Sequence, residues 1–460
     1  MASLRKKWLV SAAVFLAFIM TFAPGVQAAS SPTFSPIVNL SHDSGLSTEP
    51  IVASVGTNVY VAWEDNTNGF PQVYFVRSTD GGVTWDPISQ FTGKGSATAV
   101  QIAATGQYVL LVWKQGNHAA FAASSNNGTS FEPTITFPNA NGTVSEPSIA
   151  TNGSKGIYLA WNFASTTNGS RSAIFTASHD GGITFSSPRR ISGSISAREL
   201  QISAQASYVY VVWTSNWVYF MRSADGGGTF STPERISDPA CTSNCLSREP
   251  MITASANDVY VTWPSNLGGS YQGYIGVSHD RGSTWVRTVI FPRMYINDTR
   301  EIQVAACAGS NTQVPCAGTT NVYVTARVVG PGGGAANQWM VVSHDNGTTF
   351  SQPFDLAVQK KGHLGFGGIA VDGTSVYAFW GHKASNGIGQ MWIDESQNQG
   401  DAWEGVQQVS SSTVGVIGLN DANTQHDQGP IVSASDGNVY TVWQDQSTGN
   451  GDVYFRAGVG

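Results

Sequence analysis

Strand-like segments recur at regular spacing along most of this chain, and the most regular of them are short runs of apolar and aromatic residues. Seven of these segments end in tryptophan, as in NVYVAW and YVYVVW, and their last residues are Trp63, Trp113, Trp161, Trp213, Trp263, Trp380 and Trp443. An eighth, NVYVTA, ends at Ala326. Short segments rich in Val, Tyr and Trp predict β-strands. Because both faces of these strands are apolar or aromatic, we expect them to be buried on both sides, as in sheets stacked around an axis.

A second pattern, S-x-D-x-G-x-T-W/F, follows most of these strands. Clear copies begin at Ser78, Ser178, Ser223, Ser278 and Ser343, and weaker copies begin at Ser124 and Ser396. The Asp position of the seven copies holds Asp80, Asn126, Asp180, Asp225, Asp280, Asp345 and Asn398. Successive copies start about 45 to 65 residues apart, which indicates a repeat architecture.

Each repeat also contains a segment that begins near a glutamate, at Glu49, Glu146, Glu199, Glu249 or Glu301. Four strands in about 50 residues predict a blade of an all-β propeller with four-stranded antiparallel blades. Counting the tryptophan-type strands gives eight blades, and the weak segment near Phe366 leaves seven as the alternative. The last repeat, Pro430 to Phe455, has three strands, so we expect the segment Thr33 to Ser41 to pair with it and close the ring.

Residues 1–28 resemble a secretory signal, with Arg5 to Lys7, an apolar run from Trp8 to Phe22 that is too short to cross a bilayer, and small residues before Ala29. We expect a secreted or surface-associated mature chain with one domain over residues 29–460 and no membrane span. Removing the three positive charges moves the formal net charge from −7 to −10, which argues against a nucleic-acid partner.

The four cysteines form two close pairs, Cys241 with Cys245 and Cys307 with Cys316. In an exported chain, two local disulfides are the natural interpretation, and their spacing and the lack of nearby histidines disfavour a zinc site. Sequons of the form N-x-S/T occur at Asn39, Asn127, Asn141, Asn152, Asn168, Asn297 and Asn346 and are consistent with export.

The seven repeats resemble the Asp-box, or bacterial neuraminidase repeat, of sialidases and related propellers, and the resemblance covers nearly all of Thr33 to Phe455. It implies a structural role for the Asp positions. The carboxylate accepts backbone N–H bonds across a turn, Gly82 or Gly182 takes a positive φ, and Trp85 or Phe185 plugs the blade. The boxes should lie on the face opposite the usual substrate site of such propellers.

The other face carries the links between blades and the loops between second and third strands, and there we look for a site. The candidate ligand-binding residues are Arg198, Arg248, Arg300, Arg327, Glu199, Glu249, Glu301 and Asp65. Converging arginines would suit a sugar carboxylate, as a sialidase requires. The alternative is that each repeated Arg-Glu pair bridges neighbouring blades, because Glu also follows Thr48 and Ser145, where no Arg is present.

No tyrosine or acid matches the catalytic pattern of the sialidases residue by residue, so the catalytic residues remain unassigned. By type alone, Tyr271, Tyr274 and Tyr295 are possible nucleophiles and Asp43, Asp65, Asp427 and Asp445 possible acids. The histidines show no metal spacing, and the loops that begin at Asp65 and Asp445 do not meet the rule for Ca²⁺ loops, so we expect neither metal nor cofactor.

These observations favour a secreted sialidase-like propeller that binds a glycan or a cell-surface protein through its loop face. One alternative is an exo-acting sialidase-type glycoside hydrolase that uses some of the candidate arginines for the substrate carboxylate. A second alternative is a structural component of a surface layer or an assembly.

Overall fold

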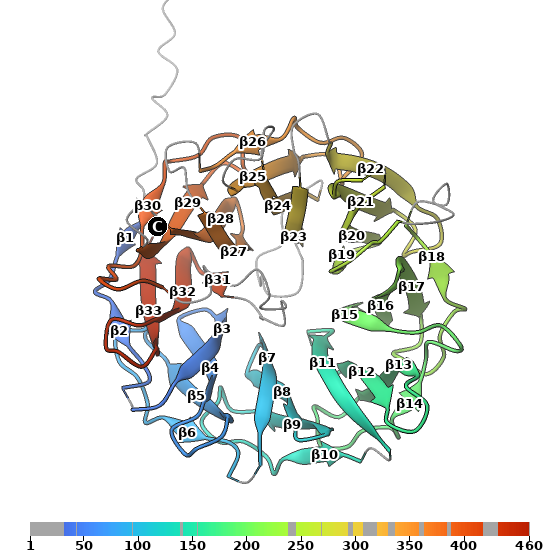
Figure 1. Cartoon of the computed structure of the whole chain (residues 1–460), viewed down its shortest axis with the longest axis horizontal. Coiled ribbons are helices and arrows are strands. Elements are labelled where there is room, and N and C mark those ends of the chain that lie inside the picture. The colour runs from blue at the N-terminus through green and yellow to red at the C-terminus, as the bar shows by residue number, and fades with distance from the viewer. Residues whose placement is uncertain are drawn as a thin grey trace, which may run out of the picture.

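The computed structural model describes residues 32–42, 44–93, 95–138, 141–153, 155–237, 245–267, 269–292, 298–306, 320–329, 336–357, 363–383, 388–416 and 431–459. Their strands form eight antiparallel sheets arranged in a ring around a central opening (Figure 1). The prediction of an all-β propeller with eight blades is confirmed, and the seven-bladed alternative is wrong.

Seven blades each contain four consecutive strands, with the first strand innermost and the fourth outermost (Figure 1). Blade 1 contains β3 (Ser47–Val55), β4 (Asn58–Asp65), β5 (Gln72–Ser78) and β6 (Ser89–Gln90), and blade 2 contains β7 (Ala97–Thr105), β8 (Tyr108–Gln115), β9 (His118–Ser124) and β10 (Ile135–Phe137). Blade 3 contains β11 (Gly142–Thr151), β12 (Ile157–Ser165), β13 (Arg171–Ser178) and β14 (Arg189–Arg190), and blade 4 contains β15 (Arg198–Gln205), β16 (Tyr208–Ser215), β17 (Trp217–Ser223) and β18 (Glu234–Arg235). Blade 5 contains β19 (Met251–Ser255), β20 (Asp258–Ser265), β21 (Gln272–Ser278) and β22 (Val286–Phe291), and blade 6 contains β23 (Asp298–Ala306), β24 (Val322–Val329), β25 (Ala336–Ser343) and β26 (Phe354–Asp355). Blade 7 contains β27 (His363–Asp372), β28 (Ser375–Lys383), β29 (Gly389–Ser396) and β30 (Gln407–Gln408).

Blade 8 joins the two ends of the described chain. Its first three strands are β31 (Val432–Ser435), β32 (Asn438–Asp445) and β33 (Asp452–Val459). Two short strands, β1 (Thr33–Phe34) and β2 (Val38–Asn39), pair with β33 in place of a fourth strand. The predicted closure is therefore confirmed, and it leaves the outer edge of β33 covered.

The hydrophobic core lies between neighbouring blades. Of the strand-ending tryptophans, Trp63, Trp113, Trp213, Trp263, Trp380 and Trp443 are among the largest fully buried side chains. Several stack on a tyrosine of the third strand, as Trp63 does on Tyr74 with ring centroids 5.9 Å apart. Blade 6 lacks this tryptophan, but Trp339 of its third strand lies opposite Ala326 and packs against the same core. The expected burial of both faces of the second strands is confirmed.

The outer strands are shorter than the sequence pattern suggested. In the segment Thr184 to Ser192, only Arg189 and Arg190 pair with the third strand. Pro188 directly precedes this pair, and a proline has no N–H to donate to the sheet. Prolines also directly precede Glu234 of β18 and Phe354 of β26, so the same limit applies to those blades.

The repeated boxes form the turns between third and fourth strands. In the first box, the N–H and hydroxyl of Thr84 donate to the Asp80 carboxylate at 2.9 and 2.6 Å, and the Gly82 N–H donates to the Ser78 hydroxyl at 2.8 Å. These bonds lower the pKa of Asp80 to about 2, the Thr84 hydroxyl contributing most. Gly82 has a φ of 88°, as the turn requires.

The aromatic residue of a box packs against a residue of the preceding blade as well as within its own blade. Trp85 meets Phe455 of blade 8 edge-on, with ring centroids 4.8 Å apart. Phe185 meets Phe121 of blade 2 in the same way, at 4.9 Å. Each box is therefore both a turn and a contact between blades. The boxes lie beside the hairpins between first and second strands, since the Gly81 N–H donates to the Thr57 carbonyl. This face is called the box face below, and the opposite face the loop face.

Candidate functional site on the loop face

The inner strands bulge where they reach the loop face. Register between first and second strands shifts between Thr48 and Ile51 in blade 1 and between Arg198 and Gln201 in blade 4. The residues at this place with φ between 44° and 53° are Glu49, Ala99, Glu146, Glu199, Glu249 and Glu301. A positive φ is costly for a residue with a side chain, so the surrounding contacts must hold it.

The bulge glutamates link each blade to the next. The backbone N–H of Glu199 donates to Glu146 Oε2 at 2.8 Å, and the N–H of Glu249 donates to Glu199 Oε2 at 2.8 Å. The N–H of Glu301 lies 3.4 Å from Glu249 Oε2 in the same arrangement. In blade 1, Glu64 at the end of β4 makes the equivalent contact, because its carboxylate accepts the N–H of Ala99 in blade 2. The recurring glutamate is therefore an inter-blade contact, which is the bridging role considered for the Arg-Glu pairs.

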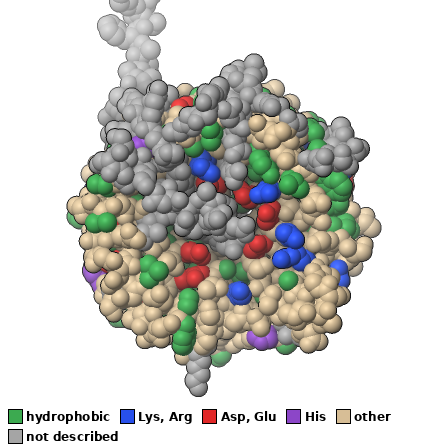
Figure 2. All heavy atoms as spheres, viewed as in Figure 1, with side chains coloured by type: hydrophobic (Ala, Val, Ile, Leu, Met, Phe, Trp, Pro, Cys, Tyr) green, Lys and Arg blue, Asp and Glu red, His purple; other side chains and the backbone are tan. Residues whose placement is uncertain are grey.

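Second bonds from the same blade fix these carboxylates further. The Thr214 hydroxyl donates to Glu199 Oε2 at 2.8 Å, and the Asn162 amide donates to Glu146 Oε2. Burial raises the pKa of Glu146 above its usual range, and the neighbouring Glu199 carboxylate adds to this effect. In Figure 2, acidic side chains gather near the middle of the face, with Lys or Arg side chains beside several of them.

The arginines that precede the bulge glutamates have different surroundings. Arg198 and Arg248 are exposed and occupy equivalent positions in blades 4 and 5. The Arg248 guanidinium lies over the Tyr271 ring, 5.6 Å from its centroid. Arg327 is half-buried, and its Nε lies 3.2 Å from Glu301 Oε1. The side chain of Arg300 is outside the described residues, so its direction stays a prediction.

The other candidates from the sequence are mostly occupied by local structure. Asp65 is buried, and it accepts the Ser47 hydroxyl at 2.6 Å and the Thr67 N–H at 2.8 Å. Asp445 is also buried and accepts the N–H of Ser447 at 2.8 Å. Both carboxylates therefore serve the turns that follow their strands.

Of the tyrosines, Tyr274 is buried against Trp263, with stacked rings 6.0 Å apart, whereas Tyr271 is half-buried beside Arg248. Tyr295, Asp43 and Asp427 lie outside the described residues. Cys241, Cys307 and Cys316 also lie outside them, so the two disulfides stay predictions.

Sequence reasoning missed two acids in β29 of blade 7. Asp394 and Glu395 are both buried, and burial raises the pKa of Asp394 to about 6. Asp394 Oδ1 accepts the N–H of Glu395 at 2.9 Å and that of Gly405 at 3.0 Å. Burial also raises the pKa of Glu395. The signal was present in the segment MWIDES, which has two acids directly before the box serine. Blades 2, 5 and 6 have no polar residue at these two positions.

Within the described ranges, no group of three or more His, Cys, Asp or Glu side chains is placed to hold a metal ion. A search of the same residues for a helix able to span a membrane found none.

The ring of Asp-box blades defines a sialidase-like β-propeller. The sequence of residues 199–441 matches the BNR repeat-like domain family, and the chain belongs to that family. No curated protein matches the sequence.

Several solved structures are similar in fold. The NanB sialidase from Streptococcus pneumoniae shares 14% identity at a TM-score of 0.42, with 82% of this chain and 69% of that one covered. The phage phi92 endosialidase shares 12% identity at a TM-score of 0.40, with 92% of this chain and 69% of that one covered. YCF48 bound to D1 peptide shares 14% identity at a TM-score of 0.44, with 80% of this chain and 96% of that one covered. Similarities this distant concern the fold and carry no information on ligand or activity.

Proposed function

We propose that this protein is a secreted binding propeller that holds an acidic glycan on its loop face, without hydrolysing it. The observation that carries the proposal is the pair of exposed guanidinium groups, Arg198 and Arg248, at equivalent positions in neighbouring blades. A guanidinium binds a carboxylate through two parallel N–H bonds, so successive arginines on one rim suit a chain of acidic sugars. Arg300 occupies the same sequence position in blade 6.

Tyr271 adds to this rim. A tyrosine ring offers an apolar face to a sugar, and the guanidinium above it is held ready for a carboxylate. An arginine and an aromatic ring that lie together in this way can contact both the charged and the apolar parts of a single sugar residue. We therefore place the centre of the proposed site at blade 5.

That the protein does not hydrolyse the glycan is inferred from the acids at the rim that the structure describes. A glycoside hydrolase needs one carboxyl group to protonate the leaving oxygen and a second group as nucleophile or base. Glu199 Oε2 accepts bonds from the next blade and from Thr214, and Glu301 faces Arg327. These acids are engaged in holding blades together, which leaves them poorly suited to exchange protons with a substrate.

The test compares 3′-sialyllactose with lactose, its neutral counterpart, by isothermal titration calorimetry on the mature protein. We expect saturable binding of the acidic sugar alone. Loss of one charge-assisted contact costs about 1.5–3 kcal/mol, so Arg248→Gln should weaken binding about 10- to 100-fold. Arg190→Gln is the matched control, because Arg190 is equally exposed but lies on the outer strand β14.

Equal binding of both sugars, or an equal effect of the two substitutions, would overturn the proposal. A fluorogenic sialoside is assayed on the same samples. Turnover that Arg198→Gln and Arg248→Gln abolish would instead establish the sialidase-type alternative. Export is tested separately, since the N-terminal sequence of protein recovered from the medium should begin near Ala29.

A further inference from the structure

The junctions between blades on the box face share two positions. The first is the residue that begins the second strand of one blade, and the second is the residue after the box Asp of the next blade. Between blades 4 and 5 these are Tyr208 and Arg281. The Arg281 guanidinium lies over the Tyr208 ring, 4.6 Å from its centroid, and Arg281 Nη1 donates to the Tyr208 hydroxyl at 3.0 Å. Two large side chains therefore fill this junction.

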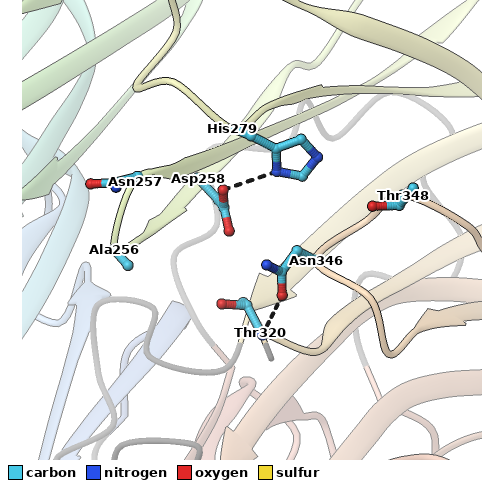
Figure 3. Close-up of a pocket in the computed structure, with 7 residues that line it drawn as sticks. All are labelled: Ala256, Asn257, Asp258, His279, Thr320, Asn346 and Thr348. Atoms are coloured by element: carbon cyan, nitrogen blue, oxygen red, sulfur yellow. Dashed lines mark hydrogen bonds and ion pairs between the residues drawn. The ribbon is translucent and has the colours of Figure 1, made fainter. Parts of the chain in front are cut away.

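The next junction, between blades 5 and 6, has shorter residues at the same two positions. Asp258 begins β20 where Tyr208 begins β16, and Asn346 follows Asp345 where Arg281 follows Asp280. A pocket of about 520 Å³ opens there, lined by Ala256, Asn257, Asp258, His279, Thr320, Asn346 and Thr348 (Figure 3). The pocket is open to solvent, and six of its seven lining residues carry polar side chains.

The acidic side chain of the pocket is held in place from two sides. Asp258 is only 8% exposed. One of its oxygens lies 3.0 Å from His279 Nδ1, and the other accepts the Tyr260 hydroxyl at 3.2 Å. In the neutral ring, the carboxylate fixes the hydrogen on Nδ1, and Nε2 is then an acceptor. The His279 side chain is 44% exposed, so a ligand can reach that nitrogen.

Donor groups face the acceptors across the pocket. Asn346 Oδ1 accepts the Thr320 N–H at 2.5 Å, so its amide nitrogen is the end that faces Asp258 (Figure 3). The Thr320 hydroxyl lies 3.3 Å from that of Ser255. Beside the pocket, Arg281 Nε donates to Asn257 Oδ1 at 2.9 Å. The pocket thus offers acceptors on one side and donors on the other.

We propose that this pocket binds a neutral sugar unit, at a site separate from the loop face. A sugar hydroxyl both donates and accepts, so neighbouring hydroxyls can donate to Asp258 and His279 Nε2 and accept from the Asn346 amide. An anionic ligand would be repelled by the Asp258 carboxylate, and a cationic ligand would face the donor end of the Asn346 amide. An aliphatic ligand would leave the buried Asp258 carboxylate without solvent or a partner on its open side.

The test is saturation-transfer NMR with D-galactose, D-glucose and N-acetyl-D-glucosamine, on protein from a bacterial host that attaches no glycan to Asn346. We expect saturable transfer to at least one of these sugars. The double variant Asp258→Tyr, Asn346→Arg copies the filled junction of blades 4 and 5 and should abolish the transfer. His279→Ala, at an exposed position, tests the same contact without rebuilding the junction and should weaken binding about tenfold, as expected for one hydrogen bond.

The outer-strand variant Arg190→Gln is the control and should bind the sugar as the wild type does. A sugar that binds equally well to wild type and to both pocket variants would overturn the proposal, and so would the failure of all three sugars to bind. Neither result affects the loop-face proposal, because that proposal is measured with an acidic ligand and other variants.

Discussion

Closure of the ring gives the sharpest test of how the blades are held together. Gly82 of the first box lies against Phe455 of the last blade, so a single methyl group at Gly82 probes the contact between the two ends of the described chain. The Cβ of Gly82→Ala would overlap the Phe455 ring, which is fully buried. The φ of 88° at Gly82 adds a second cost, because residues with a side chain rarely adopt it.

The two costs can be separated with a matched glycine. Gly69 has a φ of 93°, but a Cβ there would have no atom within 4 Å. Gly69→Ala should therefore cost only the conformational part, about 1–3 kcal/mol. Gly82→Ala adds overpacking of a filled core, about 1–3 kcal/mol, so we expect a total loss of about 2–6 kcal/mol.

Urea denaturation followed by tryptophan fluorescence measures both variants beside the wild type. The denaturation midpoint should fall for both, and clearly further for Gly82→Ala. Equal losses would mean that the Phe455 ring gives way without cost. In that case, the edge-on contact between Trp85 and Phe455 could not be what fixes the closing junction.

Three further predictions concern acids that the fold has placed in unusual surroundings. The pKa of Asp394 is raised to about 6 by burial, so the folded state binds the extra proton and stability should fall as pH rises from about 4 to 6. Asp394→Asn keeps the oxygen that accepts the Gly405 N–H, and its melting temperature should exceed that of the wild type at pH 7.5; a lower value there would contradict the sign. The pKa of Asp80 is lowered to about 2, so its contribution is present above about pH 4 and is lost as pH falls toward 2, and Asp80→Asn should flatten the melting curve against pH in that window. Glu199→Ala removes the acceptor of the Glu249 N–H and should lower the free energy of unfolding, measured with urea, by about 1–3 kcal/mol. Glu199→Gln should lower it by less, and equal losses would show that the charge rather than the hydrogen bond matters.

The fold was predictable because every blade repeats the same physical requirement. A second strand buried on both sides needs an unbroken apolar run, and Trp63 and its counterparts mark where each run ends. The short outer strands were less predictable, since one proline, such as Pro188, removes a donor and limits the pairing to the residues that follow. The segment NVYVTA does not show that Trp339 packs into the core of blade 6, which lacks the strand-ending tryptophan. That contact could be predicted only by knowing that Trp339 lies opposite Ala326.

The candidate site was predictable in its residue types but not in its directions. The recurring Arg-Glu pairs suggested either convergence or bridging, and only the positive φ of the bulge turns Glu199 toward the blade that follows it. The sequence does not reveal that geometry, because Ala99 adopts the same φ without a carboxylate. The pocket between blades 5 and 6 could not have been found by aligning the boxes, because Asn127 occupies the same box position as Asn346.

A repeat protein reveals possible sites where it departs from its own pattern, because positions that keep the pattern are already used by the fold. The Asp80 carboxylate and its counterparts are saturated by their turns, and the bulge glutamates by the next blade. What remains for a ligand is the side chain that the repeat does not require. On the loop face this is an arginine that blades 1 and 3 replace with Thr48 and Ser145, and on the box face it is the space that Asp258 leaves where Tyr208 fills it. The two proposed sites follow from the same reasoning and lie on opposite faces of the ring, so each can be tested without altering the other.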